Sequence, residues 1–194
     1  MGIYLLFGLT AGVLQVYSGV QYIRDMLLGA TRPNIVSQIV WGTICIIIVS
    51  AQLSTGFSWS VIVPLVSAIN TFIVILLCRR GYGYMNYTLV DAVSFIFALI
   101  AVVAWQMTSN PVWALVFSIG ADFAALVPTI RKTYQHPFSE SAISWILGML
   151  SCLFGFLGTA DRTFTHNVFV VYGFVADAIF IIGMFILRSK RVRE

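Results

Sequence analysis

Apolar residues run along this chain in long stretches that short polar breaks separate. A helix needs about 20 mostly apolar residues to cross a bilayer. The breaks hold turn residues such as Thr55-Gly56 and Ser109-Asn110-Pro111. The pattern predicts an all-α membrane protein with seven transmembrane helices, expected at residues 3–23, 34–53, 59–78, 87–106, 112–131, 141–158 and 168–187.

A nine-residue pattern, Pro-x3-Ser-x-Ile-x-Trp, occurs twice, at 33–41 and at 137–145, and ends in Trp41 and Trp145. Proline is tolerated in the first turn of a helix because its missing amide has no partner there. Each copy is therefore expected to begin a helix at its proline, and Ser139 is expected to cap the second helix. A duplication of this kind predicts a repeated membrane unit.

Composition agrees with the bilayer as solvent, since 60% of the 194 residues are hydrophobic and 9% are charged. A soluble domain carries about 25% charged residues. The net charge of +4 comes from basic residues at the ends of apolar stretches, which indicates topology rather than nucleic-acid binding. On one side lie Arg24, Arg32, Arg79, Arg80, Arg131, Lys132, Arg188, Lys190, Arg191 and Arg193, and on the other lies Arg162.

This asymmetry predicts an external N-terminus and a cytoplasmic C-terminus. Both copies of the motif then lie on the cytoplasmic side, so the two repeats are parallel. We expect a first three-helix repeat at 1–85, a linker helix at 86–107, and a second three-helix repeat with a short basic tail at 108–194. The expected location is a cell membrane crossed several times, with the bacterial inner membrane as the expected one.

Two carboxyl groups and one amide lie in the middle of apolar stretches, at Asp122, Asp177 and Asn70. A charge at the bilayer centre costs about 2.5–3.5 kcal/mol, so such residues usually face a cavity or a partner. We expect these three to bind a small polar solute, with Trp41 and Trp145 flanking its inner path. Asp122 and Asp177 are also the expected proton carriers, and hydrogen bonding for structure alone is the alternative for each polar residue.

Other polar residues receive structural interpretations at this point. Gln15, Tyr17 and Tyr172 are expected to pack rather than to bind, and Lys132 is expected to be an interfacial anchor. No catalytic motif occurs. We therefore expect neither an enzyme nor a cofactor, and no metal site.

The motifs and topology resemble those of the PQ-loop and SWEET group of membrane proteins, above all its small uncharacterised bacterial members. That group has two three-helix bundles joined by a linker helix, and a Pro-Gln pair in the first helix of each bundle acts as a hinge. The matching positions here read Val20-Gln21 and Pro128-Thr129. The resemblance therefore implies hinge roles for Gln21 and Pro128.

The same resemblance implies a pocket role for an Asn from the third helix of each bundle. Asn70 stands at one such position and Asp177 at the other, a departure that favours a protonatable site or a different solute. The sequence thus predicts a transporter or facilitator that moves a small polar solute by alternating access. Whether this transport is coupled to protons stays open. A receptor or scaffold on the same fold is the alternative. The bilayer and the solute are the expected partners, without nucleic acid, and a homodimer stays open.

Overall fold

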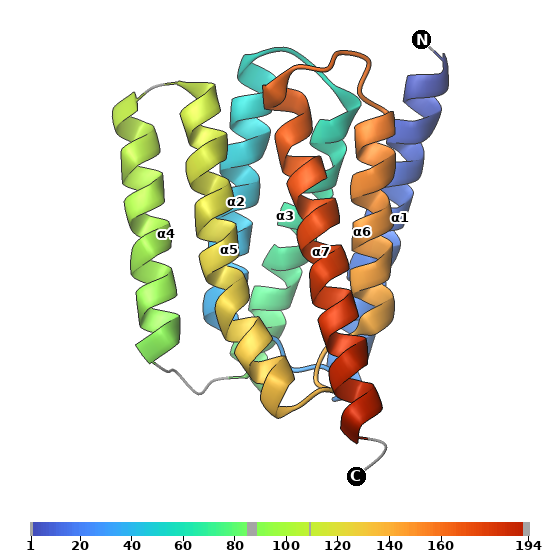
Figure 1. Cartoon of the computed structure of the whole chain (residues 1–194), viewed down its shortest axis with the longest axis vertical. Coiled ribbons are helices and arrows are strands. Elements are labelled where there is room, and N and C mark those ends of the chain that lie inside the picture. The colour runs from blue at the N-terminus through green and yellow to red at the C-terminus, as the bar shows by residue number, and fades with distance from the viewer. Residues whose placement is uncertain (1, 85–88, 109, 192–194) are drawn as a thin grey trace.

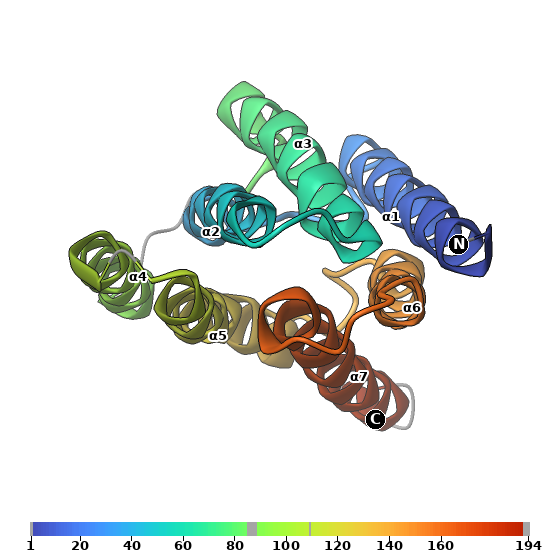
Figure 2. The ribbon, with the colours of Figure 1, turned by 90° about the horizontal axis from the view of Figure 1, so that it is seen from above.

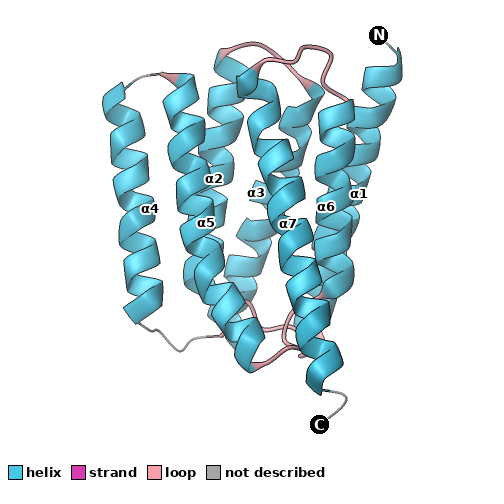
Figure 3. Ribbon diagram, in the orientation of Figure 1, coloured by secondary structure: helices cyan, strands magenta, loops and turns pink. Residues whose placement is uncertain are grey.

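The computed structural model describes residues 2–84, 89–108 and 110–191 of the chain, and almost all of them are helical (Figure 1). The α-helices are α1 (Gly2–Leu27), α2 (Ile35–Ser54), α3 (Ile62–Leu77), α4 (Leu89–Thr108), α5 (Pro111–Gln135), α6 (Ala142–Leu157) and α7 (Phe164–Arg191). A 3-10 turn, Trp59–Val61, precedes α3, and a π-helical turn, Cys78–Tyr82, follows it. Short loops connect α1 to α2, α2 to the 3-10 turn, α5 to α6 and α6 to α7 (Figure 3).

The helices lie at the predicted apolar stretches. In lipid no water can bond the backbone, so the N–H and C=O groups of each stretch must bond one another, as they do in a helix. Among the described residues, five helical spans are long and apolar enough to cross a membrane, and α6 is apolar but shorter, with 16 residues. Large apolar side chains point outward, for example Leu6 on α1, Phe72 on α3 and Ile179 on α7. An exposed apolar surface of this extent is typical of lipid contact, and the chain is a multi-pass membrane protein.

The helices form two groups that face each other. In one group α3 packs between α1 and α2, and in the other α7 packs between α5 and α6. Across the interface α1 packs on α6 and α2 packs on α5, whereas α4 lies at the edge against α5 (Figure 2). We call α1–α3 the first half and α5–α7 the second half.

The two termini lie at opposite ends of the bundle (Figure 1). At the C-terminal end, which we call the basic end, lie Arg24, Arg32, Arg79, Arg80, Arg131, Lys132, Arg188, Lys190 and Arg191. Arg162 lies in the loop between α6 and α7 at the other end, which we call the N-terminal end. Arg193 and the predicted boundary between the first repeat and the linker, at residues 85 and 86, lie outside the described residues.

The two helices of the repeated motif begin within one residue of the predicted ranges, at 35 and 142, but their prolines do not begin them. The helix α2 begins after Asn34, whose side chain accepts the amides of Val36 at 2.8 Å and Ser37 at 3.4 Å. Helix α6 begins after Ser141, whose hydroxyl accepts the amide of Ser144 at 3.4 Å. The prolines at 33 and 137 therefore precede the caps, and Ser141 rather than residue 139 caps α6. An N-cap needs a side-chain acceptor in extended backbone, and both capping residues have that backbone.

Candidate functional site

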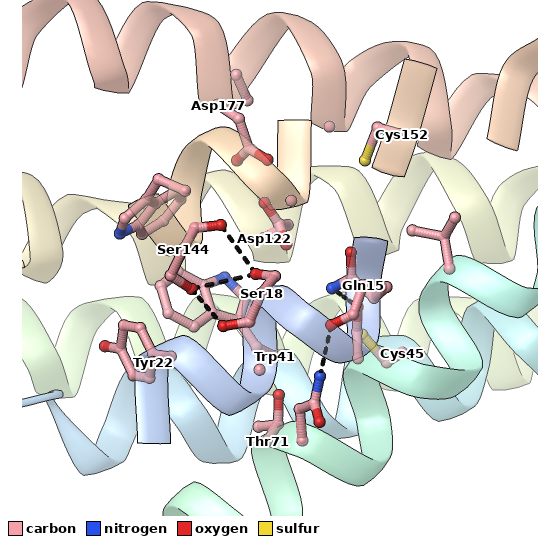
Figure 4. Close-up of a pocket in the computed structure, with 18 of the residues that line it drawn as sticks. Gln15, Ser18, Tyr22, Trp41, Cys45, Thr71, Asp122, Ser144, Cys152 and Asp177 are labelled. Atoms are coloured by element: carbon pink, nitrogen blue, oxygen red, sulfur yellow. Dashed lines mark hydrogen bonds between the residues drawn. The ribbon is translucent and has the colours of Figure 1, made fainter. Parts of the chain in front are cut away.

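A cavity of about 200 Å³ lies between the two halves at the centre of the bundle (Figure 4). Every helix of both halves contributes to its wall. Its polar wall residues are Gln15, Ser18, Tyr22, Gln38, Ser67, Asn70, Thr71, Asp122, Ser144, Tyr172 and Asp177. The wall is therefore largely apolar with several polar groups placed in it, as is usual for small-molecule binding sites.

The five residues predicted to bind solute all line this one cavity, namely Asn70, Asp122, Asp177, Trp41 and Trp145. The two predicted hinge residues do not. Gln21 lies on α1 and donates to Asp25 Oδ1 at 2.8 Å, and Pro128 is buried within α5. The fold thus brings together in one cavity residues that are more than one hundred positions apart in the sequence, such as Trp41 and Trp145.

The two acids of the cavity differ in their partners. The hydroxyl of Tyr172 donates to Asp122 Oδ2 at 2.8 Å, which joins α7 to α5. Tyr172 was expected only to pack, so its bond to an acid in the cavity corrects that expectation. In the part of the chain that the structure describes, no group donates a hydrogen bond to Asp177. Its Oδ2 lies beside Gly148, where a Cβ would stand 3.6 Å away, so the missing side chain leaves space in front of the carboxyl group.

Asn70 has a structural bond as well as a place in the cavity wall. Its Nδ2 donates to the backbone oxygen of Gln15 at 3.0 Å, which ties α3 to α1. The amide crosses α1 directly over Gly19, where a Cβ would lie 2.0 Å from Nδ2. Gln15 Nε2 donates to Ser67 at 2.7 Å, whereas Gln15 Oε1 is buried without a hydrogen-bond partner. Gln15 was also expected only to pack, and it lines the cavity.

Sequence reasoning missed Gln38, which lies inside the first copy of the repeated motif. Its side chain lines the cavity and is 5% exposed. Among the described residues, none forms a hydrogen bond with this side chain. Its position three residues before Trp41, on the same face of α2, is the signal that could have identified it.

The two tryptophans of the repeated motif meet between the halves. The rings of Trp41 and Trp145 pack edge to face with their centroids 6.2 Å apart. Trp145 also packs on Phe180 at 4.3 Å, and its Nε1 donates to Glu140 Oε2 at 3.1 Å. Both tryptophans also line the cavity, and since they lie near the starts of their helices, their contact lies toward its basic end.

A buried ion pair lies beyond the tryptophans at the basic end. Lys132 Nζ pairs with Glu140 Oε1, and these side chains are 5% and 1% exposed. Glu140 Oε2 also accepts from Tyr22 at 3.3 Å, and Lys132 Nζ donates to the backbone oxygen of Arg32 at 2.6 Å. Lys132 is therefore not the interfacial anchor that the sequence suggested, because its charge is satisfied inside the protein by Glu140.

Hydrogen bonds also join the halves at other depths. Ser18 and Ser144 bond each other's hydroxyl and backbone groups at 2.8–3.1 Å, and Ser37 donates to the backbone oxygen of Ala125 at 2.9 Å. Ser151 donates to the backbone oxygen of Ala11 at 2.9 Å, farther from the basic end. These bonds use small side chains that allow the helices to approach closely.

At the N-terminal end, His166 links α7 to the end of α2. Its Nε2 lies 3.2 Å from both Thr55 Oγ1 and the backbone oxygen of Gly56, and its Nδ1 lies 2.7 Å from Asp161 Oδ2. Partial desolvation would raise the pKa of Asp161, but the hydrogen bonds from His166 and Thr163 outweigh it and lower that pKa below its usual value of 3.8. The halves are therefore bonded at both ends of the cavity.

No group of three or more His, Cys, Asp or Glu side chains that could hold a metal ion occurs within the described ranges. Comparisons of the chain with protein-family models, with curated proteins and with solved structures found no match.

Proposed function

We propose that this protein is a carrier or facilitator for a small polar solute, which it binds in the central cavity. The observation that supports this most strongly is the cavity between the halves, whose wall holds Asn70, Asp122 and Asp177. Polar groups inside a membrane bundle are costly and usually mark a solute or ion path. Hydrogen bonds between the halves on both sides of the cavity would enclose a bound solute.

The proposed architecture has two parallel three-helix repeats and a linker helix, a 3+1+3 arrangement. The contacts support it, because the third helix of each half packs between the other two and α4 lies at the edge. The two contacts between halves, α1 with α6 and α2 with α5, exchange under a two-fold rotation that relates the repeats. This is the plan of the PQ-loop and SWEET group, and we propose that the chain shares it.

In this proposal the two halves rock about the cavity and open it to each side in turn. The Trp41–Trp145 contact and the Lys132–Glu140 pair close the basic end, and the bonds of His166 close the N-terminal end. The positive-inside rule makes the basic end cytoplasmic. Pro128 removes one helix hydrogen bond from α5 and is the proposed bending point of that helix.

Solute counterflow in proteoliposomes tests the proposal. The purified chain is reconstituted, loaded with one unlabelled solute at a time from a panel of sugars, amino acids and amines, and assayed for uptake of the labelled solute. Asn70→Ala and Asp177→Ala are expected to abolish uptake, and Ser50→Ala, on the exposed face of α2, is the matched control. Saturable binding without counterflow for every solute bound would instead favour the receptor.

Proton coupling through Asp177 is a separate part of the proposal. A carboxyl group that carries the proton should make uptake depend on pH, and Asp177→Asn should remove that dependence. An unchanged pH profile in Asp177→Asn would exclude this role for Asp177 while leaving facilitated transport intact.

A further inference from the structure

The two acids of the cavity wall offer carboxyl oxygens to which no described residue donates a hydrogen bond. Asp177 offers two carboxyl oxygens without a donor in the described part of the chain. Asp122 has one oxygen bonded to Tyr172, which leaves its second oxygen available. Acceptors that face a cavity without partners require a ligand that donates.

Gln38 provides an observation that is independent of the acids. Its side chain is 5% exposed, lines the cavity and forms no hydrogen bond with any described residue. Buried amides are nearly always hydrogen-bonded in native proteins. The amide atoms of Gln38 are not among the fully enclosed atoms that lack a partner, so they are open to the cavity, where a polar ligand can supply the partner.

The wall also lacks positive charge. No Lys, Arg or His is among its residues, and the nearest buried cation along α5, Lys132, pairs with Glu140. Arg188, on α7, donates to the backbone oxygens of Pro137 at 2.9 Å and Glu140 at 2.6 Å. The charge of Asp177 thus has no cation from the cavity wall to compensate it.

We propose that the solute is a small primary amine in its ammonium form, with the ammonium group bound at Asp177 in the cavity that Gln38 also lines. This inference rests on the proposed function only in placing the solute in the same cavity. An ammonium group has three donors and no acceptor, so it complements the carboxyl oxygens of Asp177 and Asp122 that lack a donor in the described chain. Its charge compensates a buried carboxylate, and charge-assisted hydrogen bonds are about twice as strong as neutral ones.

The size and the aromatic wall of the cavity fit the same class of solute. A volume of about 200 Å³ has room for a small organic cation. Trp41, Trp145 and Tyr172 line the cavity, and aromatic faces attract organic cations. A bare metal ion would leave most of this volume unfilled.

Binding to the purified full-length chain in detergent tests the proposal without any need for transport. The probes are ethanolammonium, its neutral counterpart ethylene glycol, choline, D-glucose and sodium chloride. A ligand that binds the native state raises the melting temperature in proportion to its affinity. We expect ethanolammonium to stabilise the chain and to bind about tenfold or more tightly than ethylene glycol in calorimetry. Choline, which has the same charge but no ammonium N–H donor, should bind more weakly than ethanolammonium.

Three variants locate the site. Asp177→Asn, which preserves the shape of the side chain, should weaken ethanolammonium binding about tenfold or more, and Gln38→Leu should weaken it by a smaller factor. Ser50→Ala, outside the cavity, should leave it unchanged. If Asp177→Asn does not fold, Gln38→Leu and the comparison of probes on the unmodified chain still decide the result.

Several results would overturn the proposal. Two of them are equal binding of ethanolammonium and ethylene glycol, and binding of D-glucose alone. The others are stabilisation by sodium chloride as large as that by ethanolammonium, and binding of none of the probes. Glucose binding that drives counterflow would overturn the amine proposal and preserve the transport function. Ethanolammonium binding without flux would preserve the amine site and contradict transport.

Discussion

Replacing Lys132 with Met would leave the Glu140 carboxylate buried without a cation. The two side chains are 5% and 1% exposed, so solvent cannot compensate the charge. Loss of one partner from a buried pair costs about 3–5 kcal/mol, against about 0–1 kcal/mol for an exposed pair. Since Tyr22 and Trp145 still donate to Glu140, we expect Lys132→Met to lower the free energy of unfolding by about 3 kcal/mol. Denaturant titration in mixed micelles, followed by tryptophan fluorescence, measures it.

The double variant Lys132→Met/Glu140→Gln separates charge burial from lost packing. Its amide keeps an acceptor for the same donors and carries no charge, so stability should return to within about 1–2 kcal/mol of the unmodified chain. Lys190→Met, at an exposed position on the basic end, is the control and should change stability by less than about 0.5 kcal/mol. The reasoning is refuted if Lys132→Met costs less than about 1 kcal/mol, or if the double variant is as unstable as the single one.

Two further predictions concern stability. Gly19→Ala places a Cβ 2.0 Å from Asn70 Nδ2 and should cost about 1–3 kcal/mol of unfolding free energy, whereas Gly183→Ala, with no atom within 4 Å, should be neutral or stabilising in the same titration. Because the pKa of Asp161 is lowered in the folded chain, its contribution to stability is present above about pH 4 and is lost as the pH falls below that. Asp161→Asn should therefore reduce the change of melting temperature with pH between about pH 5 and pH 3. An unchanged pH dependence would show that the bond to His166 adds nothing to stability.

The helices could be predicted because each spans one apolar stretch, and the length of such a stretch is set by the bilayer. The residue that caps α6 could not be predicted, because it depends on distant partners. Ser141 donates to Asp25 Oδ2 at 2.5 Å, and Glu140 is held in the loop by Lys132. Neither contact is visible as a local pattern, so Ser139, which also fits a capping position, was chosen wrongly.

The acids of the cavity and Asn70 could be predicted because a strongly polar side chain stands out within an apolar stretch. Gln38 and Tyr172 did not stand out. Gln38 lies near a helix start, where polar residues are common, and tyrosine packs well in apolar surroundings. Lys132 was misinterpreted for a related reason, since a basic residue at a helix end usually lies at the membrane interface. The partner that buries it lies across a turn, eight positions later.

Access of water to the cavity from each side of the membrane tests alternating access most directly. A single cysteine replaces Thr71, which lines the cavity on α3, after Cys45, Cys78 and Cys152 have been changed to Ala. A charged, membrane-impermeant thiol reagent is then applied to either side of oriented proteoliposomes. Ile69→Cys, which is exposed on the outer face of the same helix, is the control that lipid should protect.

The account predicts that the cysteine at position 71 reacts from both sides and that the one at position 69 reacts from neither. Reaction from one side only would contradict a carrier and indicate a receptor with a fixed opening. Reaction from neither side would contradict an accessible cavity altogether.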